Sequence, residues 1–112
     1  MAAKIPFDKS SGDVFADIGF TPAEAADLTA KSTLIIAIKD AMQKRRLTQQ
    51  EAARLCHTDQ PTLSKVLRGR MESVTIDRLA HWLNALGRDV EITVRTALRS
   101  RRIGRLRVVE AA

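Results

Sequence analysis

Residues 48–69 read TQQEAARLCHTDQPTLSKVLRG, and this stretch decides the fold. It predicts a short helix over residues 49–55 and a second one over residues 60–67. The residues between them, Cys56-His57-Thr58, have no helical pattern and predict a turn. Two short helices joined by a tight turn and packed on a longer helix make a helix-turn-helix, an arrangement that DNA-binding proteins use widely.

Helix starts and stops on both sides of this stretch complete a four-helix pattern. A long helix runs without Pro or Gly to Arg46, with a bend or break expected among the weak helix formers at 29–33. A fourth helix with an apolar face ends at Gly87, and Gly69 ends the helix before it. Each start is marked by a residue that can cap helical amides: Thr21, Thr48, Asp59 and Thr75.

The second short helix has an apolar face and a polar face. The apolar face holds the helix on the domain and consists of Leu63, Val66 and Leu67. The polar face presents hydrogen-bonding groups suited to base edges, from Gln60, Thr62, Ser64 and Lys65. Gln49 begins the first short helix, where its amide and side chain suit a phosphate, and Arg68 and Arg70 follow the second helix, where they can clamp the DNA backbone. A phosphate contact carries no base information, so losing Gln49 should weaken all DNA sequences alike.

The pattern TQ.EAA.L…QPT.S..LRG resembles the Cro/phage-repressor (XRE) family of helix-turn-helix regulators, over roughly residues 31–87. The resemblance implies a lambda-repressor-like fold. By position it implies that bases are read by Gln60, Pro61, Thr62 and Lys65, and that phosphate is gripped by Gln49 and Ser64. One residue departs from the pattern, because His57 stands where the family usually has Gly.

Two further segments are similar to a narrower branch, the HigA-antitoxin type. They are VFADIG at residues 14–19 and LGRDVEI at residues 86–92. Regulators of this branch are encoded beside RelE/HigB-like toxins. The resemblance therefore implies an antitoxin that represses its own operon and neutralises the toxin.

Beyond residue 87 the apolar period changes from helical to alternating. Val90, Ile92 and Val94 predict a half-buried strand, and Leu106 with Val108 a second, weaker one. A lone strand cannot pair its backbone, so it needs the second strand, the N-terminal arm or the same strand of another subunit. The expected organisation is an N-terminal arm (1–20), a helix-turn-helix domain (21–87) and a C-terminal extension for dimerisation with a basic tail (88–112). The arginines of residues 99–107 suit either a solvated tail or a phosphate-binding arm.

Charge is unevenly distributed along the 112 residues, whose formal net charge is +6. Residues 1–30 have two Lys against five acids, whereas residues 31–87 have ten basic groups against five acids and residues 88–112 seven Arg against three. A basic centre and tail favour a polyanionic partner, and the acidic front favours a basic protein. Three phenylalanines in residues 1–30 could anchor that protein or pack over the domain's own core: Phe7, Phe15 and Phe20.

The chain has no signal peptide, no membrane-length apolar run and a single cysteine, which predicts a cytoplasmic protein without disulfides. We expect no metal site, no cofactor and no catalytic residues, because Cys56 and His57 are adjacent in a turn and have no third partner. Trp82 lies off the apolar stripe of the fourth helix and suits the core or an interface equally.

The sequence thus predicts a mainly α-helical homodimer that represses transcription at a palindromic operator, with two recognition helices ~34 Å apart. Three alternatives stay open at this stage. The chain could be a stand-alone XRE-type repressor without a toxin partner, an interaction module that has lost DNA binding, or a small basic ribonuclease.

Overall fold

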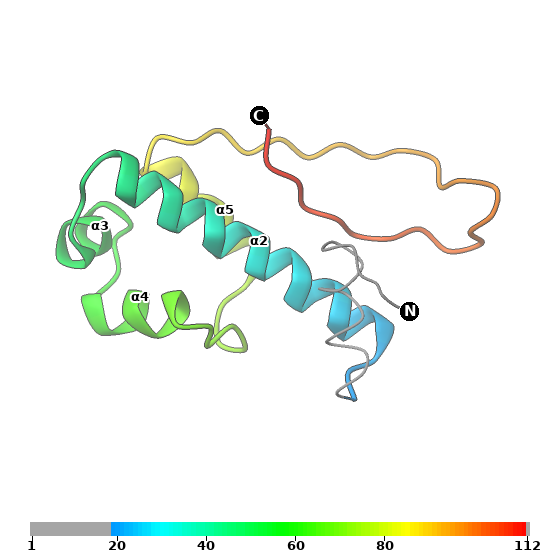
Figure 1. Ribbon diagram of the computed structural model, residues 1–112, viewed down its shortest axis with the longest axis horizontal. Helices are drawn as coiled ribbons and strands as arrows, with labels where there is room; N and C mark the ends of the chain where they lie inside the picture. Colours follow the sequence, from blue (N-terminus) through cyan, green and yellow to red (C-terminus); the bar gives the residue numbers. More distant parts are fainter. Residues whose placement is uncertain (1–18, 112) are drawn as a thin grey trace.

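The computed structural model describes residues 19–111, and this part of the chain contains four α-helices and no strand. The mainly helical fold predicted from the sequence is confirmed. No helix within residues 19–111 is long and apolar enough to cross a membrane. The helices, labelled in Figure 1, are α2 (Pro22–Lys44), α3 (Gln49–Leu55), α4 (Gln60–Leu67) and α5 (Ile76–Ala85).

Every helix begins at the capping residue that the sequence predicts. The side chain of the cap accepts a hydrogen bond from the backbone N–H three residues on, which satisfies one of the amides that a helix start leaves unpaired. The N···O distances are 3.1 Å for Thr21, 3.1 Å for Thr48, 2.7 Å for Asp59 and 3.1 Å for Thr75.

The four helices also end in the same way, with paired backbone hydrogen bonds that close a Schellman motif. After α3, the N–H of His57 donates to the Arg54 carbonyl and that of Thr58 to the Ala53 carbonyl, at 3.2 and 2.9 Å. The residue after each C-cap has a left-handed backbone, with φ between 55° and 100°, and these residues are Arg46, His57, Gly69 and Gly87. The two glycines adopt this backbone freely, whereas Arg46 and His57 do so at a steric cost.

Helix α2 runs without interruption through residues 29–33, so the break that the sequence suggests does not occur. The hydroxyl of Ser32 donates to the Leu28 carbonyl at 2.9 Å, and that of Thr33 donates to the Thr29 carbonyl at 3.2 Å. Both hydroxyls are thus satisfied along the helix itself and do not compete with its backbone hydrogen bonds.

The core lies where α2 packs against α5 and α4, with α3 packed on α4 (Figure 1). The largest side chains with at most 1% of their surface exposed lie at its centre: Ile38, Leu63, Val66, Leu79 and Leu86. Trp82 is 2% exposed and belongs to this core, so it is not available as a surface anchor on α5.

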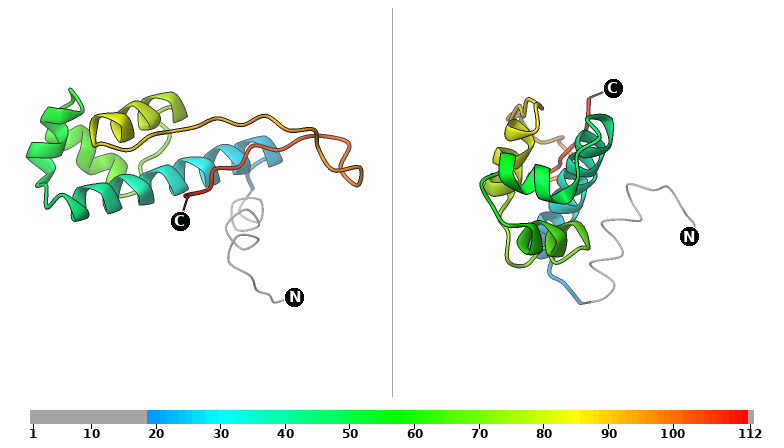
Figure 2. Two further views of the ribbon diagram at one scale, coloured as in Figure 1. Left: turned by 90° about the horizontal axis from the view of Figure 1, so that it is seen from above. Right: turned by 90° about the vertical axis from the view of Figure 1, so that its left-hand side faces the viewer.

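The C-terminal extension does not form the predicted strands. Residues 88–111, which we call the C-terminal arm, run away from the helical domain and return in a second limb (Figures 1 and 2). The two limbs exchange no backbone hydrogen bonds, so neither counts as a strand. The alternating sequence therefore has an extended course but, within the described chain, no backbone partner.

Candidate nucleic-acid interface

Helix α3 is the supporting helix of the helix-turn-helix. Its capping box is complete, because the Glu51 carboxylate accepts from the Thr48 N–H at 2.8 Å. This backbone hydrogen bond, together with that of the Thr48 side chain, lowers the pKa of Glu51. Ala52 and Ala53 are buried, and their small side chains let α3 approach the core closely.

The turn between α3 and α4 is fixed by the burial of Cys56 and by the left-handed backbone of His57. Cys56 is buried, its Sγ lies 3.7 Å from the Trp82 carbonyl oxygen, and burial raises the pKa of its thiol. His57 is exposed and has φ 55°, the left-handed backbone that its place in the family pattern requires. Cys56 is therefore a packing residue and His57 a turn residue.

Helix α4 presents one face to the core and the other outward. Leu63, Val66 and Leu67 are buried, as the sequence predicts. The residues predicted to contact DNA are exposed or half-buried and come from α4 itself or the segment after it: Gln60, Pro61, Thr62, Ser64, Lys65, Arg68 and Arg70.

Asp59 is the only acidic group at the start of α4. Hydrogen bonds from the Thr62 side chain and backbone, with a smaller contribution from the Lys65 charge, lower the pKa of Asp59. The carboxylate is thus committed to the helix cap, and the rest of the outward face carries amide, hydroxyl and cationic groups. Such groups suit an anionic ligand that offers hydrogen-bond acceptors.

Two of the predicted contact residues are joined across the motif. The Gln60 Nε2 of α4 donates to the Gln49 Oε1 of α3 at 2.8 Å, and both side chains are half-buried. Gln60 retains its own Oε1 and one N–H, which is the donor–acceptor pair that reads the edge of an adenine. The sequence places these two residues at the starts of separate helices and gives no sign of the bond.

The cationic residues after α4 differ in how they are held. The Arg68 guanidinium donates to the Ser64 Oγ at 3.0 Å, so it lies along the helix. Arg70 is exposed, and only its backbone N–H is tied, to the Lys65 carbonyl at 3.0 Å. The structure thus brings Ser64 and Arg68 together and leaves the Arg70 side chain separate.

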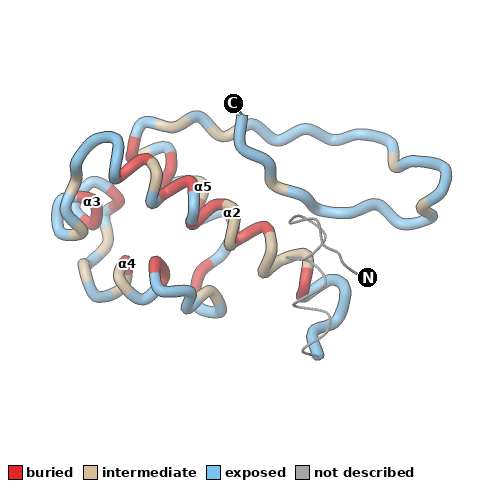
Figure 3. The backbone as a smooth tube through the Cα atoms, viewed as in Figure 1, coloured by how far each residue is buried: buried red, intermediate tan, exposed pale blue. Residues whose placement is uncertain are grey.

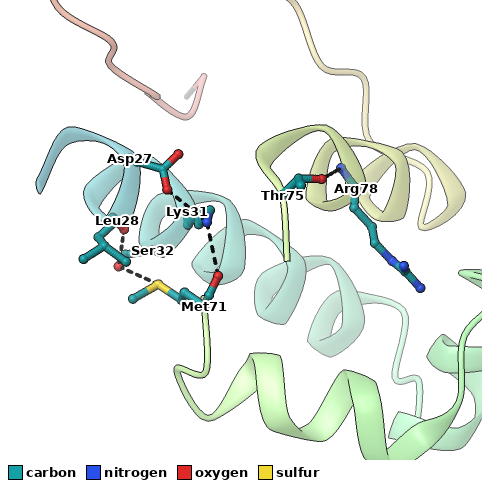
Figure 4. Close-up of polar contacts among 7 residues, drawn as sticks. All are labelled: Asp27, Leu28, Lys31, Ser32, Met71, Thr75 and Arg78. Carbon is teal, nitrogen blue, oxygen red and sulfur yellow. Dashed lines mark hydrogen bonds and ion pairs between the residues drawn. The ribbon is translucent and has the colours of Figure 1, made fainter. Parts of the chain in front are cut away.

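The loop after α4 is tethered to α2 by a contact that the sequence does not predict (Figure 4). Lys31 is 8% exposed, and its Nζ donates to the Met71 carbonyl at 3.2 Å while pairing with Asp27 at 2.9 Å. The Ser32 hydroxyl lies 3.4 Å from the Met71 Sδ. These contacts fix the point to which the chain returns after the outward helix. A lysine inside a long helix is ordinarily exposed to solvent, so the sequence gives no reason to expect Lys31 to be buried. The carbonyl that accepts its hydrogen bond lies 40 residues further along the chain.

Comparisons with known proteins agree with this geometry. A family model described as a helix-turn-helix domain matches residues 14–95. A solved structure, provisionally titled an XRE family transcriptional regulator, is similar to the chain with a TM-score of 0.71. It is 36% identical, and the match covers 78% of this chain and 98% of that one. The comparison with curated proteins gave no match.

Proposed function

The chain belongs to the XRE-type family of helix-turn-helix proteins, and from this premise we propose that it is a transcriptional repressor that reads operator DNA with α4. The observation that carries the proposal is the outward face of α4, where Gln49 orients Gln60 at the start of the helix and the cations Lys65 and Arg68 lie near its end. Gln60 and its neighbours on α4 supply base contacts, and Gln49, Ser64, Arg68 and Arg70 supply phosphate contacts.

The test is a gel-shift and footprint experiment with the promoter of the chain's own gene. Gln60→Ala should relax the sequence preference, whereas Gln43→Ala is a matched control, because Gln43 is an exposed glutamine on α2 outside the motif. If Gln60→Ala keeps full affinity and preference, α4 is not the reading helix.

We also propose that the protein binds its operator as a homodimer. One eight-residue helix contacts only a few base pairs, and a two-fold pair would place two such helices in successive major grooves. Removal of residues 88–112 should give a monomer in sedimentation experiments, with operator affinity much reduced. An intact dimer after this removal would place the interface on the helical domain instead.

The finer proposal is that the repressor is an antitoxin that regulates its own operon. It is supported by the acidic charge of residues 1–30 and by the HigA-type resemblance. Residues 1–18, which include Phe7 and Phe15, lie outside the described part of the chain. The segment would join α2 at Thr21, the end of that helix farthest from α3 (Figure 1), so a basic toxin held there would leave the α4 face open.

A variant lacking residues 1–20 tests the antitoxin role. We expect it to keep operator binding and to lose co-purification with the product of the neighbouring gene, because opposite charge and apolar anchors would both be removed. If this variant still binds that product as tightly as the full chain does, residues 1–20 do not form the toxin-binding site. If the neighbouring gene encodes no small basic protein, a stand-alone repressor is the better reading.

A further inference from the structure

The C-terminal arm exposes apolar side chains at alternating positions. Ile92 is 89% exposed and Val94 is 92% exposed, although both are among the most apolar residue types. Figure 3 shows that exposed residues make up most of the arm. The backbone groups of residues 89–97 form no hydrogen bond within the described chain. An edge with unpaired amides and exposed β-branched residues is a template for another strand.

The base of the arm is nevertheless fixed to the helical domain. The Arg88 guanidinium donates to the Asp40 carboxylate of α2 at 3.1 Å, and hydrogen bonds from Arg88 and Lys44 lower the pKa of Asp40. Val90 and Val108 pack against the core. The first limb therefore leaves the domain in a defined direction, on the face opposite α4 (Figures 1 and 2).

The two limbs of one arm are poorly matched to each other. The Arg101 N–H donates to the Leu98 carbonyl at 2.9 Å, and this turn sets the register of any hairpin that continues from it. In that register Val94 would face Arg105 and Ile92 would face Arg107. Apolar side chains would then oppose guanidinium groups, which gives a physical reason for the absence of hydrogen bonds between the limbs.

The segment DVEITVR at residues 89–95 is, by contrast, complementary to itself in the antiparallel sense. With the two-fold axis at Ile92, Val90 faces the Val94 of a second copy and Ile92 faces its own counterpart. On the opposite face of the strand, Asp89 faces Arg95, so both ends of the segment bring unlike charges together. A shift of the axis to Thr93 would also pair Ile92 with Val94 and Glu91 with Arg95. It would, however, put Val90 opposite Thr96 and leave Asp89 opposite Ala97, so the apolar pairs at the ends of the segment would be lost.

We propose that residues 89–95 of two copies pair as antiparallel strands about a two-fold axis at Ile92, and that this strand pair is the dimer interface. This inference rests on the homodimer proposed above for operator binding, and it specifies the register in which the two strands pair. Pairing satisfies the backbone groups along one edge of the first limb and places Ile92 and Val94 against apolar side chains of the second copy. Because the arm and α4 lie on opposite faces of the domain, both recognition helices stay open in the dimer.

Site-specific cross-linking of the full chain tests the register. Residues directly opposite in an antiparallel pair have Cα atoms close enough for a disulfide. Mild oxidation of dilute Ile92→Cys should give a covalent dimer, and Thr93→Cys should give several-fold less. The native Cys56 is buried, so the unmodified chain is a clean control. Equal or preferential cross-linking at Thr93→Cys would overturn the proposed axis.

Charge exchange tests the same pairing without cysteines. Asp89→Arg and Arg95→Asp should each weaken dimerisation about tenfold, because each replaces two attractive pairs with two repulsive ones. The double variant should restore the affinity, whereas Arg99→Asp, outside the segment, should leave dimerisation unchanged. Failure of the double variant to restore dimerisation refutes the Asp89–Arg95 pairing. Sedimentation measures these constants without DNA, so loss of the dimer and loss of operator reading are scored separately.

Discussion

The hydrogen bond between Gln60 and Gln49 changes what substitution of the supporting helix should do. A phosphate contact alone would make Gln49→Ala weaken every DNA sequence equally. The 2.8 Å bond to Gln60 means that Gln49 also orients the residue that reads the base. One hydrogen bond between half-buried amides contributes about 0.5–1.5 kcal/mol, so Gln49→Ala should also reduce base discrimination, by roughly 2- to 12-fold.

A double-mutant cycle measures this coupling. Gln60→Ala should cost about 1–3 kcal/mol of discrimination, roughly 5- to 150-fold, when anisotropy titrations compare the operator with a duplex changed at one base pair. The double variant should lose no more discrimination than Gln60→Ala alone, because Gln49 acts on the base only through Gln60. Additive losses of discrimination, or a uniform loss of affinity in Gln49→Ala, would refute the orienting role.

Three further predictions concern stability and are measured by urea unfolding. His57→Gly should stabilise the fold by about 0.5–1 kcal/mol, because His57 is exposed and its φ of 55° strains a side chain that glycine lacks; an unchanged midpoint would show that the turn holds no strain. Capping hydrogen bonds lower the pKa values of Glu51 and Asp59, so their stabilisation is complete above the ordinary values of 4.5 and 3.8 and is lost as pH falls through the lowered ones. Glu51→Gln should therefore flatten the acid branch of the stability curve, and an identical curve would contradict the assignment. Lys31→Ala should cost about 1–3 kcal/mol, because the Met71 carbonyl loses a charged donor, whereas the exposed Lys39→Ala on the same helix should cost almost nothing.

The helix boundaries could be predicted from the sequence because each depends on local chemistry. Thr48 and Asp59 cap their helices through residues three positions away, and Gly69 and Gly87 end theirs. The apolar face of α4 follows from a periodicity that spans only eight residues. Local patterns of this kind are visible without any knowledge of the tertiary structure.

The contacts that the sequence does not reveal are those between distant segments. The buried Lys31 depends on a carbonyl 40 residues away, and the amide of Gln60 on a side chain 11 residues before it. Trp82 lies off the apolar stripe of its helix, yet it is buried in the same core cluster as Cys56, which comes from the turn 26 residues earlier. The arm illustrates the opposite case: alternation predicts a strand at Val90–Val94, but a strand needs a partner that the described chain does not supply.

The arginines of the C-terminal arm limit how many chains can associate by pairing strands through their arms. Six of them lie between residues 95 and 107, and no acid stands among them. Exposed edges rich in valine and isoleucine are the segments from which fibres grow, since each added chain offers the next a fresh edge. A third arm would bring six more positive charges against the twelve already present in a pair, so growth beyond two chains is opposed. High salt screens this repulsion, and concentrated protein should therefore aggregate through its arms when ionic strength is raised.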